Sequence, residues 1–195
     1  MRVLGVSFAL LFWVAAAAAQ APGAKPATPA PGAKPAPTAK PAAQAPAARP
    51  ANAPVGNLAQ VMRSILFHNS NLIFATQSDD PADPKKPLDA SFGTYAKTYT
   101  GWPVVESAAV ALAESVDIIL KPGRLCSNGR PVPVDRADFR KFAQGLRAAG
   151  QAALKAAQSK SMDNMVEVSG TVSEACENCH SVYRDKPDLK NRCIP

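Results

Sequence analysis

Apolar residues recur at helical spacing through most of the chain beyond residue 55. Side chains three, four and seven positions apart share one face of an α-helix, so this repeat predicts amphipathic helices. Four are predicted: about residues 57–77, from 103 to 120, from 135 past 154, and from 161 into the segment around 180. No apolar-polar alternation indicates a strand. The fold prediction is therefore all-α, and four helices with short or medium connections favour an antiparallel four-helix bundle.

Local signals indicate where these helices begin and how they run. Pro103 suits the first turn of the second helix, and Asp135 is predicted to cap the third, with Asp138 three residues later. The Asn-Ser-Asn run at residues 69–71 predicts a bend in the first helix. Gly150 predicts a close contact between the third helix and a neighbour.

A long connection between the first two helices, from residue 78 to about 101, is rich in Asp, Pro and Lys. Three aromatic residues lie in it, namely Phe92, Tyr95 and Tyr99. Their spacing predicts a short turn of helix packed on the surface.

The first 55 residues have a different composition. Residues 1–19 begin with Arg2, continue through an apolar stretch and finish in an alanine tract, which predicts a secretory signal peptide. An uncleaved membrane anchor is the alternative, because the apolar run is at the short limit for a bilayer span. Residues 20–55 are almost entirely Ala, Pro and spaced Lys, and they predict a disordered, extended linker that could reach on the order of 100 Å. Residues 56–195 are the predicted globular domain. The signal peptide predicts export of this domain to the periplasm.

The formal charge of +7 does not indicate a nucleic-acid partner. Five of the 22 basic residues lie in the first 49 positions, whereas all 15 acidic residues lie beyond residue 55. The predicted domain is therefore near +2 (17 − 15), too little for a basic surface that binds DNA.

The chemistry is concentrated in Cys176-Glu177-Asn178-Cys179-His180, in the last predicted helix. A Cys-x-x-Cys-His run is typical of covalent haem attachment, in which both thiols bond to the haem vinyl groups and the imidazole ligates the iron. Cys176 and Cys179 are therefore predicted to hold one haem c, and His180 to be the proximal iron ligand.

Two other uses of this motif are disfavoured. A thioredoxin-like site is expected near a βαβ pattern, which the sequence lacks. A zinc site formed by Cys176, Cys179, His180 and Cys193 has enough ligands. It explains neither the four helices nor the signal peptide.

The remaining cysteines, Cys126 and Cys193, follow the second and fourth predicted helices, which end on the same side of an antiparallel bundle. In an oxidising compartment they are predicted to form a disulfide, although two free thiols are the alternative. The chain-entropy argument gives roughly 4 kcal/mol for a loop of this length.

The string from Cys176 to Arg184, Cys-x-x-Cys-His-x-x-Tyr-Arg in a C-terminal helix, resembles class II c-type cytochromes: cytochrome c′ and its low-spin, methionine-ligated relatives. The resemblance covers about residues 56–192. It implies a haem among the helices near one end of the bundle, with the proximal His on the last helix. In the low-spin members a methionine of the first helix, at a position like that of Met62, is the sixth ligand. In cytochrome c′ proper the five-coordinate iron binds small gases.

Helix order also favours Met62, because the start of the first helix and the end of the last share one end of an antiparallel bundle. Met165 precedes His180 by about 22 Å along one helix, so neither it nor Met162 can reach the same iron. His68 is the rival ligand. It projects about 240° round the helix from Met62, so both cannot bind one iron without a break between them. The alternative for Met62 is that its side chain only fills space in the core and does not bind iron.

Arg63 and Arg184 are candidates to bind the haem propionates, because a guanidinium group matches a carboxylate in a fork. Solvated surface charges are the alternative for both. Tyr183 is predicted to pack against the haem edge.

The functional prediction is a periplasmic monohaem cytochrome that transfers electrons to a redox partner protein and is not an enzyme. His and Met ligands raise the reduction potential of a haem, and a fully ligated iron needs no substrate pocket. The alternative is a five-coordinate protein that binds NO or CO. Association of two bundles into a homodimer is left open, and no membrane span is expected in the mature form.

Overall fold

The computed structural model describes residues 50–90 and 97–195, which fall within one compact unit, Ala47–Pro195. The predicted signal peptide, most of the predicted linker, and Phe92 and Tyr95 of the predicted helical turn lie outside the described residues. Tyr99, the third aromatic of that turn, is 69% exposed. Within the described part the structure is helical, with no strand and two isolated bridges, so the prediction of an all-α fold is confirmed.

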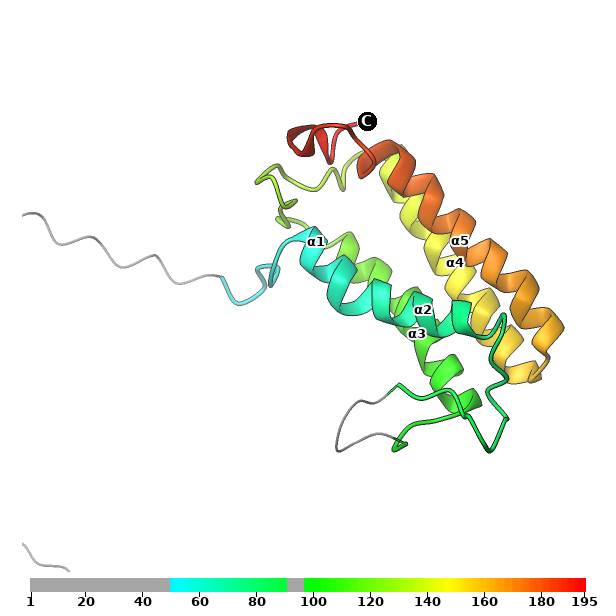
Figure 1. The fold of residues 1–195 in the computed structure, drawn as a ribbon. Coiled ribbons are helices and arrows are strands. Elements are labelled where there is room, and N and C mark those ends of the chain that lie inside the picture. The colour runs from blue at the N-terminus through cyan, green and yellow to red at the C-terminus, as the bar shows by residue number, and fades with distance from the viewer. Residues whose placement is uncertain (1–49, 91–96) are drawn as a thin grey trace, which may run out of the picture. The chain divides into compact units, whose positions relative to one another are not determined.

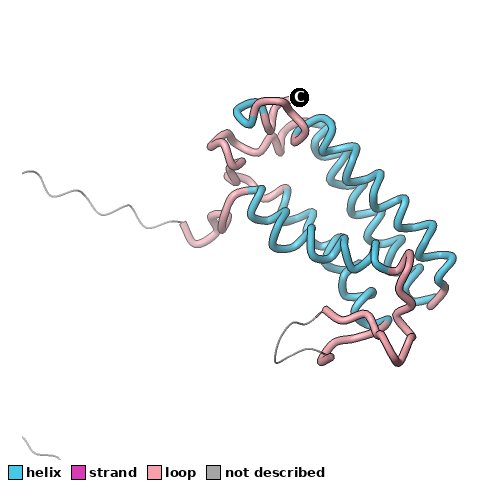
Figure 2. The backbone as a smooth tube through the Cα atoms, viewed as in Figure 1, coloured by secondary structure: helices cyan, strands magenta, loops and turns pink. Residues whose placement is uncertain are grey.

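The helices follow the predicted order (Figures 1 and 2). The first helical run combines α1 (Leu58–Val61), the π-helical segment η1 (Met62–Leu66) and α2 (Phe67–Ala75). It is followed by α3 (Trp102–Ile119), α4 (Ala137–Ser159), α5 (Met162–Tyr183) and a short 3₁₀ helix, η3 (Leu189–Asn191). None of the helices in the described residues has the length and apolar composition needed to cross a bilayer.

The helix starts are encoded locally. Asn57 caps α1 in a capping box, because its side chain accepts a hydrogen bond from the backbone N–H of Gln60 while the Gln60 side chain accepts one from the N–H of Asn57. Pro103 lies in the first turn of α3, as predicted. Ser161 caps α5 by accepting from the N–H of Asn164.

The predicted cap of α4 is wrong. The helix begins at Ala137, Arg136 occupies the N-cap position, and no side chain makes a capping hydrogen bond. Asp138 lies in the first turn of α4, where a negative charge interacts favourably with the helix dipole. Its carboxylate accepts two hydrogen bonds from Arg136. This ion pair occupies the region where the sequence suggested a cap at Asp135.

The predicted bend at residues 69–71 does not interrupt the helix. The side chains of Asn69, Ser70 and Asn71 bond to carbonyls one turn earlier, and α2 continues through them. The helix changes geometry one turn before, in η1, where the N–H of Phe67 bonds to the carbonyl of Met62. Such π segments inside α-helices often occur at functional sites.

The core lies along α3. Its apolar face is almost fully buried against α2 and α4, and α5 packs on α4 and α2. Gly150 lets α4 approach α3 closely, because a Cβ atom at this position would lie 2.7 Å from the backbone nitrogen of Ala113. The predicted close contact at Gly150 is therefore confirmed.

Candidate cofactor site

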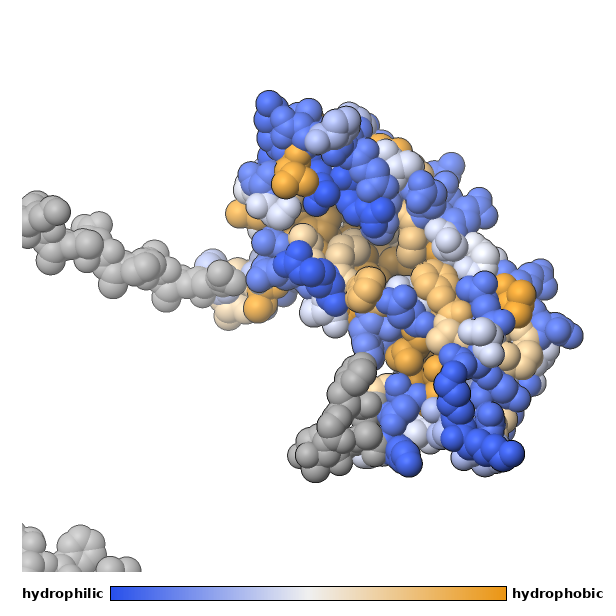
Figure 3. Space-filling model, viewed as in Figure 1, coloured by the Kyte–Doolittle hydropathy of each residue, from blue (hydrophilic) through white to orange (hydrophobic). Residues whose placement is uncertain are grey.

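A cavity of about 510 Å³ opens between the first helical run and the C-terminal half of α5. Its walls come from α1, η1, α2, α4, α5 and the segment after α5, with one residue of α3 and the loop that follows α3. In Figure 3, apolar surface is gathered in the hollow between the first helical run and α5. A space of this size with mainly apolar walls falls in the range of small-molecule and cofactor sites.

The three residues of the predicted haem motif line one wall of this cavity. Cys176 and Cys179 are three positions apart in the last turns of α5, so they share a helix face, and His180 follows directly. All three side chains are half-buried, and neither cysteine is in a disulfide. The motif therefore presents two thiols and an imidazole to one space.

Burial changes the protonation of these groups. It raises the pKa of Cys179 to about 11, with a smaller contribution from Cys176, and it also raises the pKa of Cys176. Burial, followed by the charge of Arg184, lowers the pKa of His180. Near neutral pH the site therefore holds two thiols and a neutral imidazole with a free lone pair.

These protonation states bear on the other uses of the motif. A redox-active dithiol needs a depressed thiol pKa, the opposite of what burial produces here. The zinc alternative needs Cys193 as a ligand, but that residue forms a disulfide with Cys126. Across residues 50–90 and 97–195, no cluster of three or more His, Cys, Asp or Glu residues suits a metal ion.

Met62 lines the same cavity from the opposite wall. It is the first residue of η1 and is half-buried. Met165 is fully buried in the core, and neither Met165 nor Met162 belongs to the cavity lining. His68, the rival ligand, also lies outside the lining.

Arg63 and Arg184 both reach the cavity lining, but in different states. Arg63 is exposed on the first helical run. Arg184 donates two hydrogen bonds to the carboxylate of Asp185, at 2.6 and 3.0 Å. The guanidinium of Arg184 is therefore already engaged by the residue that follows it in the sequence.

Tyr183 also lines the cavity and is buried, with 5% of its surface exposed. Its ring lies edge-on to Phe139 and Phe142, with centroid distances of 5.1 and 6.4 Å. Its hydroxyl accepts a hydrogen bond of 3.0 Å from Nε of Arg136, which also binds Asp138. Tyr183 thus joins the end of α5 to the start of α4.

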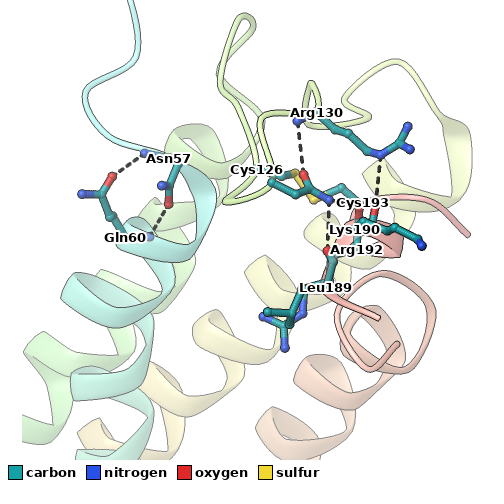
Figure 4. Close-up of a disulfide and its surroundings, with 9 residues drawn as sticks. Asn57, Gln60, Cys126, Arg130, Leu189, Lys190, Arg192 and Cys193 are labelled. Atoms are coloured by element: carbon teal, nitrogen blue, oxygen red, sulfur yellow. Dashed lines mark hydrogen bonds between the residues drawn. A yellow bond between two sulfur atoms is a disulfide. The ribbon is translucent and has the colours of Figure 1, made fainter. Parts of the chain in front are cut away.

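The disulfide between Cys126 and Cys193 lies beside the motif, and both cysteines contribute to the cavity wall. It ties the loop after α3 to the C-terminal segment (Figure 4). Asn128 reinforces the link by donating to three carbonyls, those of Leu189, Lys190 and Arg192, at 3.0–3.2 Å. The wall of the cavity beyond α5 is therefore fixed covalently and by hydrogen bonds.

Several residues of the site were not predicted to belong to it. Phe139, Phe142 and Leu146 of α4 form an apolar wall, yet their spacing indicated only a helix face that packs in the core. Arg192 contributes to the wall from the C-terminal segment, where the sequence carries no helix period to place it. Arg136 binds Tyr183 across 47 positions, a contact that no local pattern signals.

The donor set fits a covalently attached haem. It combines two protonated thiols, a neutral imidazole, a thioether on the facing wall, apolar surfaces and arginine side chains at the edge. Thiols can form thioether bonds, imidazole and thioether are axial ligands of haem iron, and arginine binds carboxylates. Comparison of the chain with protein-family models, with curated proteins and with solved structures gives no match.

Proposed function

We propose that this protein is an exported monohaem c-type cytochrome that transfers electrons, with His180 and Met62 as axial ligands. The observation that carries the proposal is that Cys176, Cys179 and His180 on α5 share one cavity with Met62 of η1. The motif and the methionine are 118 positions apart (180 − 62), so their convergence is a property of the fold. A haem held there would supply a reversible one-electron iron couple.

The residues of the chain have distinct tasks in this proposal. Cys176 and Cys179 would hold a haem through thioether bonds to its vinyl groups. Burial raises the pKa of both thiols, so both are protonated near neutral pH. His180 holds its lone pair available because burial disfavours its protonated form. The aromatic side chains of α4 exclude water from one wall.

The helix contacts support the four-helix bundle that the resemblance implies. α2 packs on α3, α3 on α4, α4 on α5, and α5 on α2, which is a closed ring of neighbours. α4 and α5 are joined by only two residues, Lys160 and Ser161, and Lys160 has the left-handed backbone (φ 53°) common at helix C-termini. In an antiparallel bundle the start of the first helical run and the end of α5 lie at one end, and both segments contribute residues to the cavity lining.

A low-spin spectrum with His and Met ligation is the expected signature. We expect the oxidised protein to show a weak near-infrared methionine-to-iron band, and Met62→Ala to abolish it and to convert the iron to a high-spin form that binds CO when reduced. Met165→Ala is the matched control, since that side chain is buried outside the cavity.

The same measurement separates the two cytochrome functions. If the wild-type protein is already high-spin and binds CO or NO readily, the gas-binding alternative holds and the role of Met62 is wrong. A protein purified from a host with haem-attachment machinery that carries no covalent haem would contradict both functions.

A further inference from the structure

Arg192, in the segment that follows η3, carries a buried polar atom that the interactions of the chain leave unexplained. Among the described residues, its Nε is the one buried side-chain nitrogen or oxygen without a hydrogen-bond partner. The residue is half-buried and lines the cofactor cavity. A buried donor without a partner is costly, so native proteins normally supply an acceptor.

Another arginine shows how this fold treats a buried guanidinium group that serves the structure. Arg124 is 3% exposed, and its Nε donates to the carbonyl of Ile118 at 3.1 Å. Its Nη1 donates to the carbonyls of Val55 and Gly56. Arg124 therefore finds its acceptors in the backbone, whereas Nε of Arg192 has no acceptor among the described residues.

The backbone beside Arg192 is held in place before any ligand binds. Its carbonyl accepts from Asn128 at 3.0 Å, and the next residue, Cys193, is in the disulfide. The N–H of Cys193 also donates to the carbonyl of Tyr183 at 2.8 Å. A side chain presented from a fixed backbone loses little further conformational freedom on binding, which favours a recognition role.

Charges around the cavity favour an anionic ligand group. Three guanidinium groups, those of Arg63, Arg184 and Arg192, line it together with a single carboxylate, that of exposed Glu177. Hydrogen bonds from Arg184 lower the pKa of Asp185, and the charge of nearby Arg192 adds a smaller effect, but both oxygens of Asp185 are already bound by Arg184. Of these three arginines, Arg192 is the one with a buried N–H group, at Nε, that has no hydrogen-bond partner.

We propose that Arg192 binds a carboxylate of the molecule in the cavity, and that with haem there this group is a propionate. The inference rests on the proposed function, because it takes the ligand to be a haem. It transfers to Arg192 the role that the sequence suggested for Arg184, whose fork is occupied by Asp185. Arg192 would then bind the edge of the haem, and the adjacent disulfide would hold the backbone of Arg192 in place.

The test uses the full-length protein with haem attached, in four forms: wild type, Arg192→Met, Arg192→Lys and Lys190→Gln. Lys190→Gln is the matched control, because it removes the same charge from the same segment at a residue outside the cavity lining. Resonance Raman spectroscopy reports the propionate bending band, and potentiometry reports the midpoint potential. Covalent haem is first verified by mass spectrometry in each form.

Arg192→Met is expected to shift the propionate band and to lower the midpoint potential, because an uncompensated carboxylate favours ferric iron. Lys190→Gln should leave the band unchanged. An unchanged band in Arg192→Met, or the same lowering of potential in both variants, overturns the inference. If Arg192→Met does not fold, Arg192→Lys is the deciding variant, because it keeps the positive charge but lacks Nε. An unchanged propionate band in Arg192→Lys would then overturn the inference. Absence of covalent haem from the wild type would instead defeat the proposed function.

Discussion

The α3–α4 interface and the cavity end of the molecule are built from opposite kinds of contact. At the interface small residues bring two backbones together, so that Gly150 of α4 lies against Ala113 of α3. At the cavity end, large side chains such as Phe139 and Phe142 line a space of about 510 Å³. Close packing holds the first region, whereas a disulfide and side-chain hydrogen bonds to the backbone hold the second. Around the cavity, where close packing is absent, a disulfide and hydrogen bonds hold the chain together instead.

Removal of the disulfide should have the largest effect on stability. We expect Cys126→Ala/Cys193→Ala to lower the free energy of unfolding by about 2–5 kcal/mol, because the 67-residue separation closed by the bond is released in the unfolded chain. Chemical denaturation of the purified, oxidised protein measures this change.

The reduced wild type is the control for the double variant. A thiol reductant breaks the bond that the double variant lacks, so reduced wild type and the double variant should unfold at the same denaturant concentration. Equal stability of the variant and the oxidised wild type would show that hydrogen bonds alone hold the cavity end.

Gly150→Ala, at the α3–α4 interface, should have the next largest effect on stability. Its Cβ would lie 2.7 Å from the backbone nitrogen of Ala113, so α3 and α4 must separate. We expect a loss of about 1–3 kcal/mol, typical of overpacking, in thermal or denaturant unfolding.

Gly145→Ala in the same helix is the matched control for Gly150→Ala. A Cβ at Gly145 meets nothing within 4 Å, so the variant should gain about 0.5–1 kcal/mol from helix propensity. If both variants are stabilised, the interface is less tight than its geometry indicates.

The Arg136–Asp138 pair should give the smallest effect, confined to acid. Hydrogen bonding to Arg136 lowers the pKa of Asp138 from 3.8 to about 2. Because the folded pKa lies below the unfolded one, the contribution is present above about pH 4 and is lost as the pH falls toward 2. Asp138→Asn should therefore flatten the pH dependence of unfolding in that window and leave its slope near pH 7 unchanged. An identical acid profile for variant and wild type would contradict this role.

The helices could be predicted from the sequence because their signals are local. The apolar repeat, Pro103 and Ser161 all act within a turn or two of the chain, and the structure places helix starts there. The errors have local causes as well. Asp135 is a good capping residue by type, but the side chain of Arg136 binds Asp138 instead, and the helix begins without a cap.

The candidate site was predictable only in part. The residue types and spacing of Cys176, Cys179 and His180 indicate haem attachment without any structure, since that chemistry needs groups adjacent on one helix turn. Arg184 could have been recognised as engaged, because Asp185 follows it directly. The apolar wall of α4 could not, because a helix face that lines a cavity has the same period as one that packs in a core.

The sequence by itself determined the helical segments and the attachment motif, because periodicity, capping and motif chemistry depend on neighbours along the chain. Helix order favoured Met62 as the residue opposite the motif, but only the tertiary structure showed the cavity that both line and the π-helical segment that begins at Met62. The tertiary structure also leaves Nε of Arg192 buried at the edge without a partner. These features depend on how helices distant in sequence pack around a space, which local patterns do not encode.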